Sequence, residues 1–228
     1  MRSVFRCTSR FADSPASGAS WRLLWRVVAV ACALGASTSC TASQFSGQSS
    51  SYVIIQSLQG ASGAEPDEFG GTLASDVQTL VDVDVNGQQV QSPTIYEDLG
   101  RVVLQLAMKN PPAAGGLEPT TMNFITLNRY RVTFVRADGR NSPGVDVPYP
   151  FDGAITVTVG DEPVTVSMPL VRIQSKLEQP LLPLVGGGGA LAISTIAEVT
   201  FYGADQTGRE VSVSGRISVT FADWGDPV

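Results

Sequence analysis

The residue types that carry most acid–base and metal chemistry are scarce in this sequence. None of its 228 residues is histidine. A Ser-His-Asp triad, a Cys-His dyad, an imidazole zinc site and a histidine pH sensor are therefore excluded. Its three cysteines, Cys7, Cys32 and Cys40, all lie in the first 40 residues. Removal of an N-terminal leader would leave at most Cys40, and so no disulfide and no thiolate metal site.

One segment has the residue pattern that opens a calcium-binding loop. Asp82, Asp84 and Asn86 alternate along the chain before a glycine, so their oxygens could surround a hard cation. The twelfth position, where such a loop needs a bidentate acid, is Pro93. A strand with outward aspartates that ends in an Asn-Gly turn explains the same residues, and we favour it. The acids that could complete a calcium site from other loops are Glu97, Asp98 and Asp205.

Two arginines and several acids are weaker candidates. Arg129 and Arg131 share one face of a predicted strand and could bind a carboxylate, although such residues more often line a solvent-exposed sheet. Adjacent acids could supply a glycosidase pair, but the mature chain offers a single tryptophan, Trp224, as a sugar platform. The acid clusters are Glu65–Glu68, Glu97–Asp98 and Asp161–Glu162. The run 186–189 of four glycines lacks the Lys-Ser/Thr of a phosphate loop and is interpreted as a flexible connection.

The first 39 residues have the three-part pattern of a secretory signal peptide. Five arginines and one acid precede an uncharged run, 27–36, and small residues follow it. The run is ten residues long, whereas a transmembrane helix needs about 20. We therefore expect residues 1–39 to be removed on export. The basic region is long, so translation could start downstream of Met1.

The end of this segment, Ser37-Thr38-Ser39-Cys40, resembles a bacterial lipoprotein signal. That resemblance implies that Cys40 is lipidated and that residues 40–51 form a polar tether, with the membrane reached through the N-terminal lipid. Ser37 departs from the Leu, Val or Ile usual in the family. Thr41 is not the aspartate that retains such proteins at the inner membrane, so the resemblance favours the outer membrane. Ordinary cleavage near Ala42, giving a periplasmic or secreted protein, is the alternative.

The predicted mature chain is acidic. Five of 15 basic residues and one of 21 acidic residues precede residue 41. The mature chain therefore keeps 10 basic and 20 acidic residues, which is a net charge of −10. A nucleic-acid partner, which requires a basic surface, is therefore not expected. Electrostatic adhesion to anionic lipid headgroups is disfavoured for the same reason.

Alternation of apolar and polar residues predicts strands throughout the rest of the chain. Apolar residues favour a two-sheet core, so we expect an antiparallel β-sandwich. Gly160-Asp161 predicts a hairpin between its flanking strands, and 173–179 is the one helical candidate. The expected strands are 52–58, 81–85, 101–108, 127–136, 154–159, 164–170, 195–202 and 210–221.

The stretch 196–213 resembles the final hairpin of bacterial immunoglobulin-like and fibronectin type III-like domains. Apolar residues alternate up to Gly203-Ala204-Asp205, and Gly208 precedes a second alternating run. The resemblance implies an immunoglobulin-like sandwich and says little about activity. We expect residues 52–228 to form one such domain, with long inserts near 60–71, 111–121 and 174–189.

These observations favour an exported lipoprotein whose sandwich is a non-catalytic structural or protein-interaction module, without a cofactor. Its partner would be an unidentified protein of the cell envelope. The alternative is a carbohydrate-binding or calcium-dependent ligand-binding domain, with hydrolysis as a remote extension. That alternative requires a concave acidic site with an exposed aromatic residue.

Overall fold

The structure, a computed structural model, describes residues 49–109 and 119–224, in which most residues belong to strands and very few to helices. All the described residues belong to one compact unit. The prediction of an all-β fold is confirmed, while the predicted leader and Cys40 lie outside the described residues. The strands are β1 (Ser51–Ala61), β2 (Thr72–Asp76), β3 (Thr79–Val85), β4 (Gln88–Thr94), β5 (Asp98–Met108), β6 (Ile125–Val135), β7 (Phe151–Val159), β8 (Val164–Val171), β9 (Ala192–Asp205) and β10 (Glu210–Ala222). The helical segments are η3 (Thr121–Asn123), α2 (Ile173–Leu177) and η4 (Leu182–Leu184).

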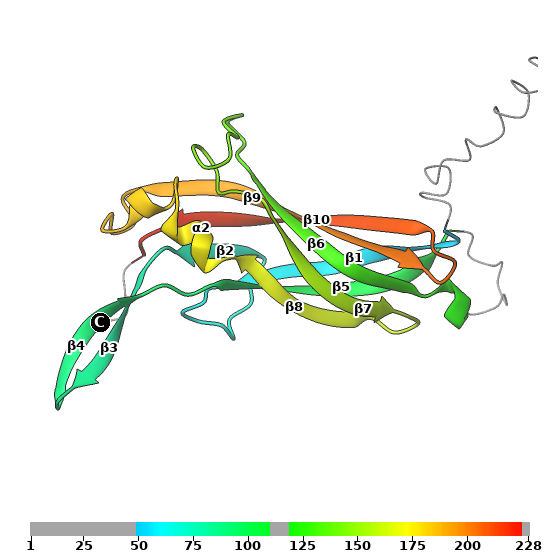
Figure 1. Cartoon of the computed structure of the whole chain (residues 1–228), viewed down its shortest axis with the longest axis horizontal. Coiled ribbons are helices and arrows are strands. Elements are labelled where there is room, and N and C mark those ends of the chain that lie inside the picture. Colours follow the sequence, from blue (N-terminus) through cyan, green and yellow to red (C-terminus); the bar gives the residue numbers. More distant parts are fainter. Residues whose placement is uncertain (1–48, 110–118, 225–228) are drawn as a thin grey trace, which may run out of the picture. The chain divides into compact units, whose positions relative to one another are not determined.

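The described strands form a three-stranded sheet, a five-stranded sheet and a separate hairpin (Figure 1). The three-stranded sheet has the order β1-β5-β8, and the five-stranded sheet has the order β2-β10-β9-β6-β7. Most neighbours are antiparallel, as expected. The exception is β2, which pairs in parallel with β10, so that Leu73 lies opposite Val219. The chain leaves β1 in the three-stranded sheet and enters the five-stranded sheet at β2, which runs in the same direction as β10.

Period-two alternation sets which side chains face the core. On β6, Tyr130, Val132 and Phe134 are buried, whereas Arg129 and Arg131 point outward, as predicted. The expected final hairpin is also present, since β9 and β10 pair along their whole length. Its large buried apolar residues are Val199, Phe201, Ile217, Val219 and Phe221.

Both sheets contribute to one apolar core. Phe134 and Phe221 meet edge to face with ring centroids 5.6 Å apart, and both side chains belong to the five-stranded sheet. The Tyr130 hydroxyl crosses the core and donates a hydrogen bond to the Pro169 carbonyl on β8, 3.3 Å away. Burial of this shared apolar surface is the main stabilising contribution to the fold.

The predicted hairpin at Gly160-Asp161 is wrong. β7 pairs with β6 in the five-stranded sheet, whereas β8 pairs with β5 in the three-stranded sheet. Residues 160–163 therefore carry the chain from one sheet to the other. Glycine and aspartate indicate that a chain turns, but they do not indicate which strands then pair.

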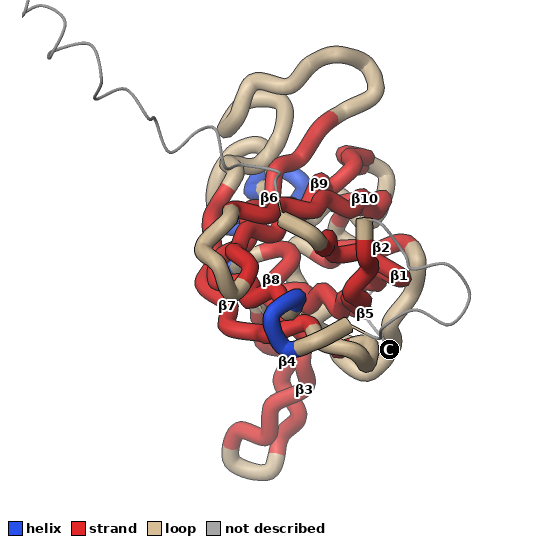
Figure 2. Tube along the Cα trace, turned by 90° about the vertical axis from the view of Figure 1, so that its right-hand side faces the viewer, coloured by secondary structure: helices blue, strands red, loops and turns tan. Residues whose placement is uncertain are grey.

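The β3–β4 hairpin is an insertion between β2 and β5, and it extends away from the two larger sheets (Figures 1 and 2). Asn86 and Gly87 both have positive φ, 57° and 82°, which is the backbone of the predicted tight turn. Val83 and Val85 remain 43% and 49% exposed, so neither strand is packed into the core at this end.

The predicted helix is confirmed as the short α2, whose Lys176 is buried.

Candidate functional site

Arg129 and Arg131 do bind a carboxylate, and it belongs to this chain. The register of β6 and β7 places Asp152 directly opposite Arg131. The Asp152 carboxylate accepts hydrogen bonds from Arg131 Nη1 at 2.8 Å and from Arg129 Nη1 at 3.1 Å. All three side chains are 41–50% exposed, so solvent weakens these ion pairs. The arginine pair is thus a surface ion-pair cluster within the five-stranded sheet.

A pocket of about 750 Å³ lies beside Arg129. The Arg129 guanidinium stacks over the Tyr202 ring at 4.1 Å, and this pair forms part of the pocket wall. The side chain of Tyr52, from β1, is 41% exposed and lies at the same pocket. The described residues that line it are Ser49, Ser51, Tyr52, Lys109, Asn128, Arg129, Tyr202, Gly203, Ala204, Gly208, Glu210, Val211 and Ser212.

Two aromatic rings and both signs of charge meet in this pocket. Glu210 and Arg129 could bind hydroxyl or carboxylate groups, while Tyr52 and Tyr202 offer faces for an apolar ring. Of these residues the sequence singled out only Arg129. The others come from separate strands, and an alternating pattern along one strand does not indicate which neighbours share a pocket.

Asp82, Asp84 and Asn86 lie at the tip of the β3–β4 hairpin. Asn86 is part of the turn, and the Asp84 carboxylate accepts a hydrogen bond from the Gly87 amide at 2.7 Å. All three residues are exposed, and none of the other acids proposed for a calcium site comes from this hairpin. Among the described residues there is no group of three or more acidic, histidine or cysteine side chains placed to hold a metal ion.

The acids considered for glycosidase chemistry are dispersed. Glu65–Glu68 lies in the exposed loop after β1, and Asp161 and Glu162 lie in the exposed crossover between β7 and β8. Glu97 and Asp98 are adjacent in sequence, but Glu97 is exposed and Asp98 is buried. These clusters therefore share no site.

A buried ion pair joins α2 to the start of β5. Lys176 Nζ lies 2.8 Å from Asp98 Oδ1, and the two side chains are 1% and 0% exposed. Asp98 also accepts hydrogen bonds from the Ser75 hydroxyl at 2.6 Å and from the Gly63 amide at 2.9 Å. Burial raises the pKa of Asp98 above its ordinary value, although Lys176 and these donors oppose the rise. Four segments thus meet at one carboxylate, which indicates a structural role.

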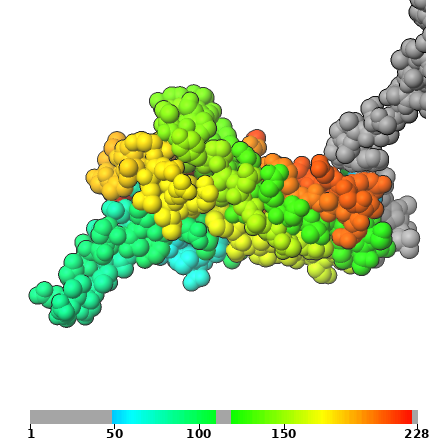
Figure 3. All heavy atoms as spheres, in the orientation of Figure 1, coloured from blue at the N-terminus to red at the C-terminus, as the bar shows by residue number. Residues whose placement is uncertain are grey.

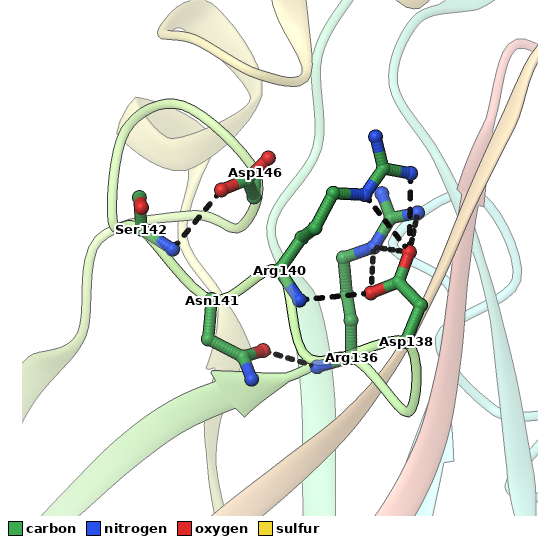
Figure 4. Close-up of polar contacts among 6 residues, drawn as sticks. All are labelled: Arg136, Asp138, Arg140, Asn141, Ser142 and Asp146. Carbon is green, nitrogen blue, oxygen red and sulfur yellow. Dashed lines mark hydrogen bonds and ion pairs between the residues drawn. The ribbon is translucent and has the colours of Figure 1, made fainter.

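The loop 136–150 after β6 is organised by its own polar side chains (Figure 4). Arg136 and Arg140 both bind the Asp138 carboxylate, at 2.7 and 3.1 Å. Hydrogen bonds, chiefly from Arg136, hold the pKa of Asp138 far below its usual range. The Asn141 side chain accepts a hydrogen bond from the Arg136 amide at 2.6 Å, which closes the first part of the loop, residues 136–141. In the space-filling view the loop forms a raised lobe (Figure 3).

Apolar side chains are exposed on the loop 136–150 as well as on the hairpin. Val145 is 71% exposed and Tyr149 is 52% exposed. The β3–β4 hairpin exposes Val83, Val85 and Val90 by 43–49%. Both projections therefore present apolar groups on frameworks that hydrogen bonds hold in place.

No helix in the part of the chain that the structure describes has the length and apolar character to cross a membrane. In comparisons with protein families, with curated proteins and with solved structures, nothing matches this chain.

Proposed function

We propose that this chain is an exported lipoprotein, anchored to the cell envelope through Cys40, whose β-sandwich is a non-catalytic protein-interaction module. The three-part leader and the Ser-Thr-Ser-Cys sequence support export and lipidation. Several charged side chains pair with one another and are therefore not free to act as catalytic groups, which supports a binding role over catalysis. Arg129 and Arg131 bind Asp152, Arg136 and Arg140 bind Asp138, and Lys176 binds Asp98.

Strand order supports an immunoglobulin-like sandwich. If β1, β5 and β8 are the A, B and E strands, then β10, β9, β6 and β7 are the G, F, C and C′ strands of the second sheet. β2 then becomes a second part of strand A that crosses to the edge of strand G. The crossover at 160–163 takes the place of a hairpin between C′ and E. In this scheme the β3–β4 hairpin is an insertion before strand B.

The single observation that carries the interaction role is the β3–β4 hairpin. Ten of its residues, from Asp82 to Gln91, are exposed in succession, including three valines. A strand pair that packs so little against the two larger sheets contributes little to the core. The fold therefore does not depend on the hairpin for its stability. Binding of a partner that covers the exposed valines would explain why the hairpin is present.

Substitution of Cys40 tests the anchoring claim. The unsubstituted chain, expressed in a bacterial host with an outer membrane, is expected in the membrane fraction with the added mass of a lipid. Cys40→Ala should move the protein to the soluble envelope fraction, whereas Cys32→Ala, inside the predicted leader, should leave the lipid in place. An unlipidated chain, or a Cys40→Ala chain that stays with the membrane, would contradict the proposal.

A second candidate function is carbohydrate binding at the pocket beside Arg129. The observation that favours it is the pair of tyrosines, Tyr52 and Tyr202, at one polar pocket. Tyr202→Ala should then abolish binding in a glycan-array screen, while Tyr149→Ala, an exposed tyrosine outside the pocket, should not. Absence of any glycan binding by the unsubstituted chain would dispose of this function.

A further inference from the structure

At Asp82 and Asp84 the outer edge of β3 has no strand beside it among the described residues. Among the described residues β3 pairs only with β4, and Pro93 of β4 lies opposite Leu80. Opposite residues in an antiparallel pair alternate between those that exchange hydrogen bonds and those that do not, and proline has no N–H to donate. Pro93 therefore belongs to a pair without hydrogen bonds. Asp82 and Asp84 lie two and four residues after Leu80, so they also belong to pairs without hydrogen bonds. Their backbone N–H and C=O groups therefore point away from β4.

The opposite edge, on β4, is less suited to pairing. Pro93 interrupts its row of outward donors, whereas β3 has no proline between Thr79 and Val85. Sheet edges that are to stay unpaired are often protected by proline in this way. The hairpin thus has one edge that proline interrupts and one edge without proline.

The two faces of β3 have different chemistry. Val81, Val83 and Val85 lie on one face, and Asp82 and Asp84 lie on the other. The three residues at the end of the strand, from Val83 to Val85, are exposed. Neither aspartate takes part in an ion pair with a described residue, and the Asp82 side chain has no hydrogen-bond partner among them. An added strand would meet valines on one face and uncompensated carboxylates on the other.

A second copy of this chain is a poor occupant of that edge. Antiparallel pairing of two β3 strands with their valine faces together places Asp82 of one copy against Asp84 of the other. Like charges directly opposite each other destabilise a strand pair. The net charge of −10 expected for the mature chain adds to this repulsion.

We propose that the outer edge of β3 binds an extended segment of another protein in which apolar residues alternate with lysine or arginine. The segment adds a third strand to the hairpin. Its backbone bonds to Asp82 and Asp84, its apolar side chains cover the valines, and its cations pair with the two carboxylates. This inference rests on the proposed interaction role and names the class of partner.

A synthetic peptide tests the inference directly. The probe is fluorescein-labelled Lys-Val-Lys-Val-Lys-Val-Lys, with blocked ends, and the protein is the full chain carrying Cys40→Ala. Anisotropy should report saturable binding, and the amide protons of Asp82 and Asp84 should exchange more slowly with solvent in the complex. Asp82→Asn with Asp84→Asn should weaken binding roughly fivefold or more, because two cross-strand charge pairs are lost.

Matched controls separate strand addition from attraction between opposite charges. Asp161→Asn with Glu162→Asn makes the same change of charge on the β7–β8 crossover and should leave the affinity unchanged. The same peptide with the backbone nitrogens of its lysines methylated keeps its charge but should not bind, because in the proposed pairing the lysine N–H groups face Asp82 and Asp84. Equal weakening by the two double variants, binding of the methylated peptide, or unchanged exchange at β3 would overturn the inference. None of these results bears on the anchoring of Cys40, which the fractionation experiment decides by itself.

Discussion

Lys176 on α2 and Asp98 on β5 form an ion pair of 2.8 Å that solvent does not reach. Removal of one charge from such a pair leaves the other buried without a counter-charge. Lys176→Met should therefore lower the free energy of unfolding by about 3–5 kcal/mol. Chemical denaturation at pH 7 measures the loss.

The matched control for that variant is Arg216→Met, which breaks an ion pair with Glu198 at a side chain that is 70% exposed. It should cost no more than about 1 kcal/mol. Adding Asp98→Asn to Lys176→Met should recover part of the lost stability. The amide carries no charge, its oxygen can still accept the hydrogen bond from the Gly63 amide, and its NH2 group can donate to the Ser75 hydroxyl oxygen. Equal effects of Lys176→Met and Arg216→Met would contradict a stabilising role for the buried pair.

Acid sensitivity should arise in part at Asp205, in the turn between β9 and β10. Burial opposes ionisation of Asp205, but hydrogen bonds from the Thr207 side chain and the Arg209 amide outweigh it and lower the pKa. A lowered pKa in the folded state stabilises the fold above the ordinary pKa of aspartate, 3.8, and this stabilisation is lost as pH falls through the lowered value. Asp205→Asn should therefore lose less stability than the unsubstituted chain between pH 5 and pH 2. Denaturant midpoints across that range test this, and parallel pH curves would refute it.

Gly153 on β7 should not tolerate a side chain. A Cβ atom at this position would overlap the ring of Tyr130, which is 3% exposed and packs against Phe151 and Phe201. Gly153→Ala should therefore destabilise the fold by roughly 1–3 kcal/mol, because the core must shift to make room. Gly139→Ala is a useful contrast, since its Cβ would meet no atom and only its positive φ adds strain. Thermal unfolding should rank Gly153→Ala as the less stable of the two.

The β3–β4 hairpin should be removable without loss of the fold. Joining Val81 to Ser92 through a two-residue Asn-Gly turn keeps an existing cross-strand pair and deletes only exposed residues. We expect the free energy of unfolding to change by less than about 1 kcal/mol. Circular dichroism during thermal unfolding measures this, and a large loss would mean that the hairpin stabilises the core.

Local sequence patterns predicted much of the strand content and little of the pairing. The alternation around Tyr130 and Phe134 identified the buried face of β6, and Asn86-Gly87 identified the hairpin turn, because both depend on neighbouring residues. Gly160-Asp161 gave the wrong pairing for β7 and β8. Each of these strands alternates in the same way whether it joins its neighbour or the opposite sheet.

Contacts between distant residues had no signal in the sequence. Asp98 and Lys176 are 78 positions apart, and nothing in the run of α2 indicates that its lysine is buried. The carboxylate that binds Arg129 and Arg131 could not be predicted either, because Asp152 faces them only when the register of β6 and β7 is known. The pocket beside Arg129 draws on several strands for the same reason.

The parallel pairing of β2 with β10 has a consequence for the order of folding events. It links residues near the start of the domain to its last strand, and the Trp224 amide donates a hydrogen bond to Asp76, 148 positions earlier. Contacts so remote in sequence raise the contact order and slow folding. During synthesis, β2 must wait for the final strand before it can join the five-stranded sheet.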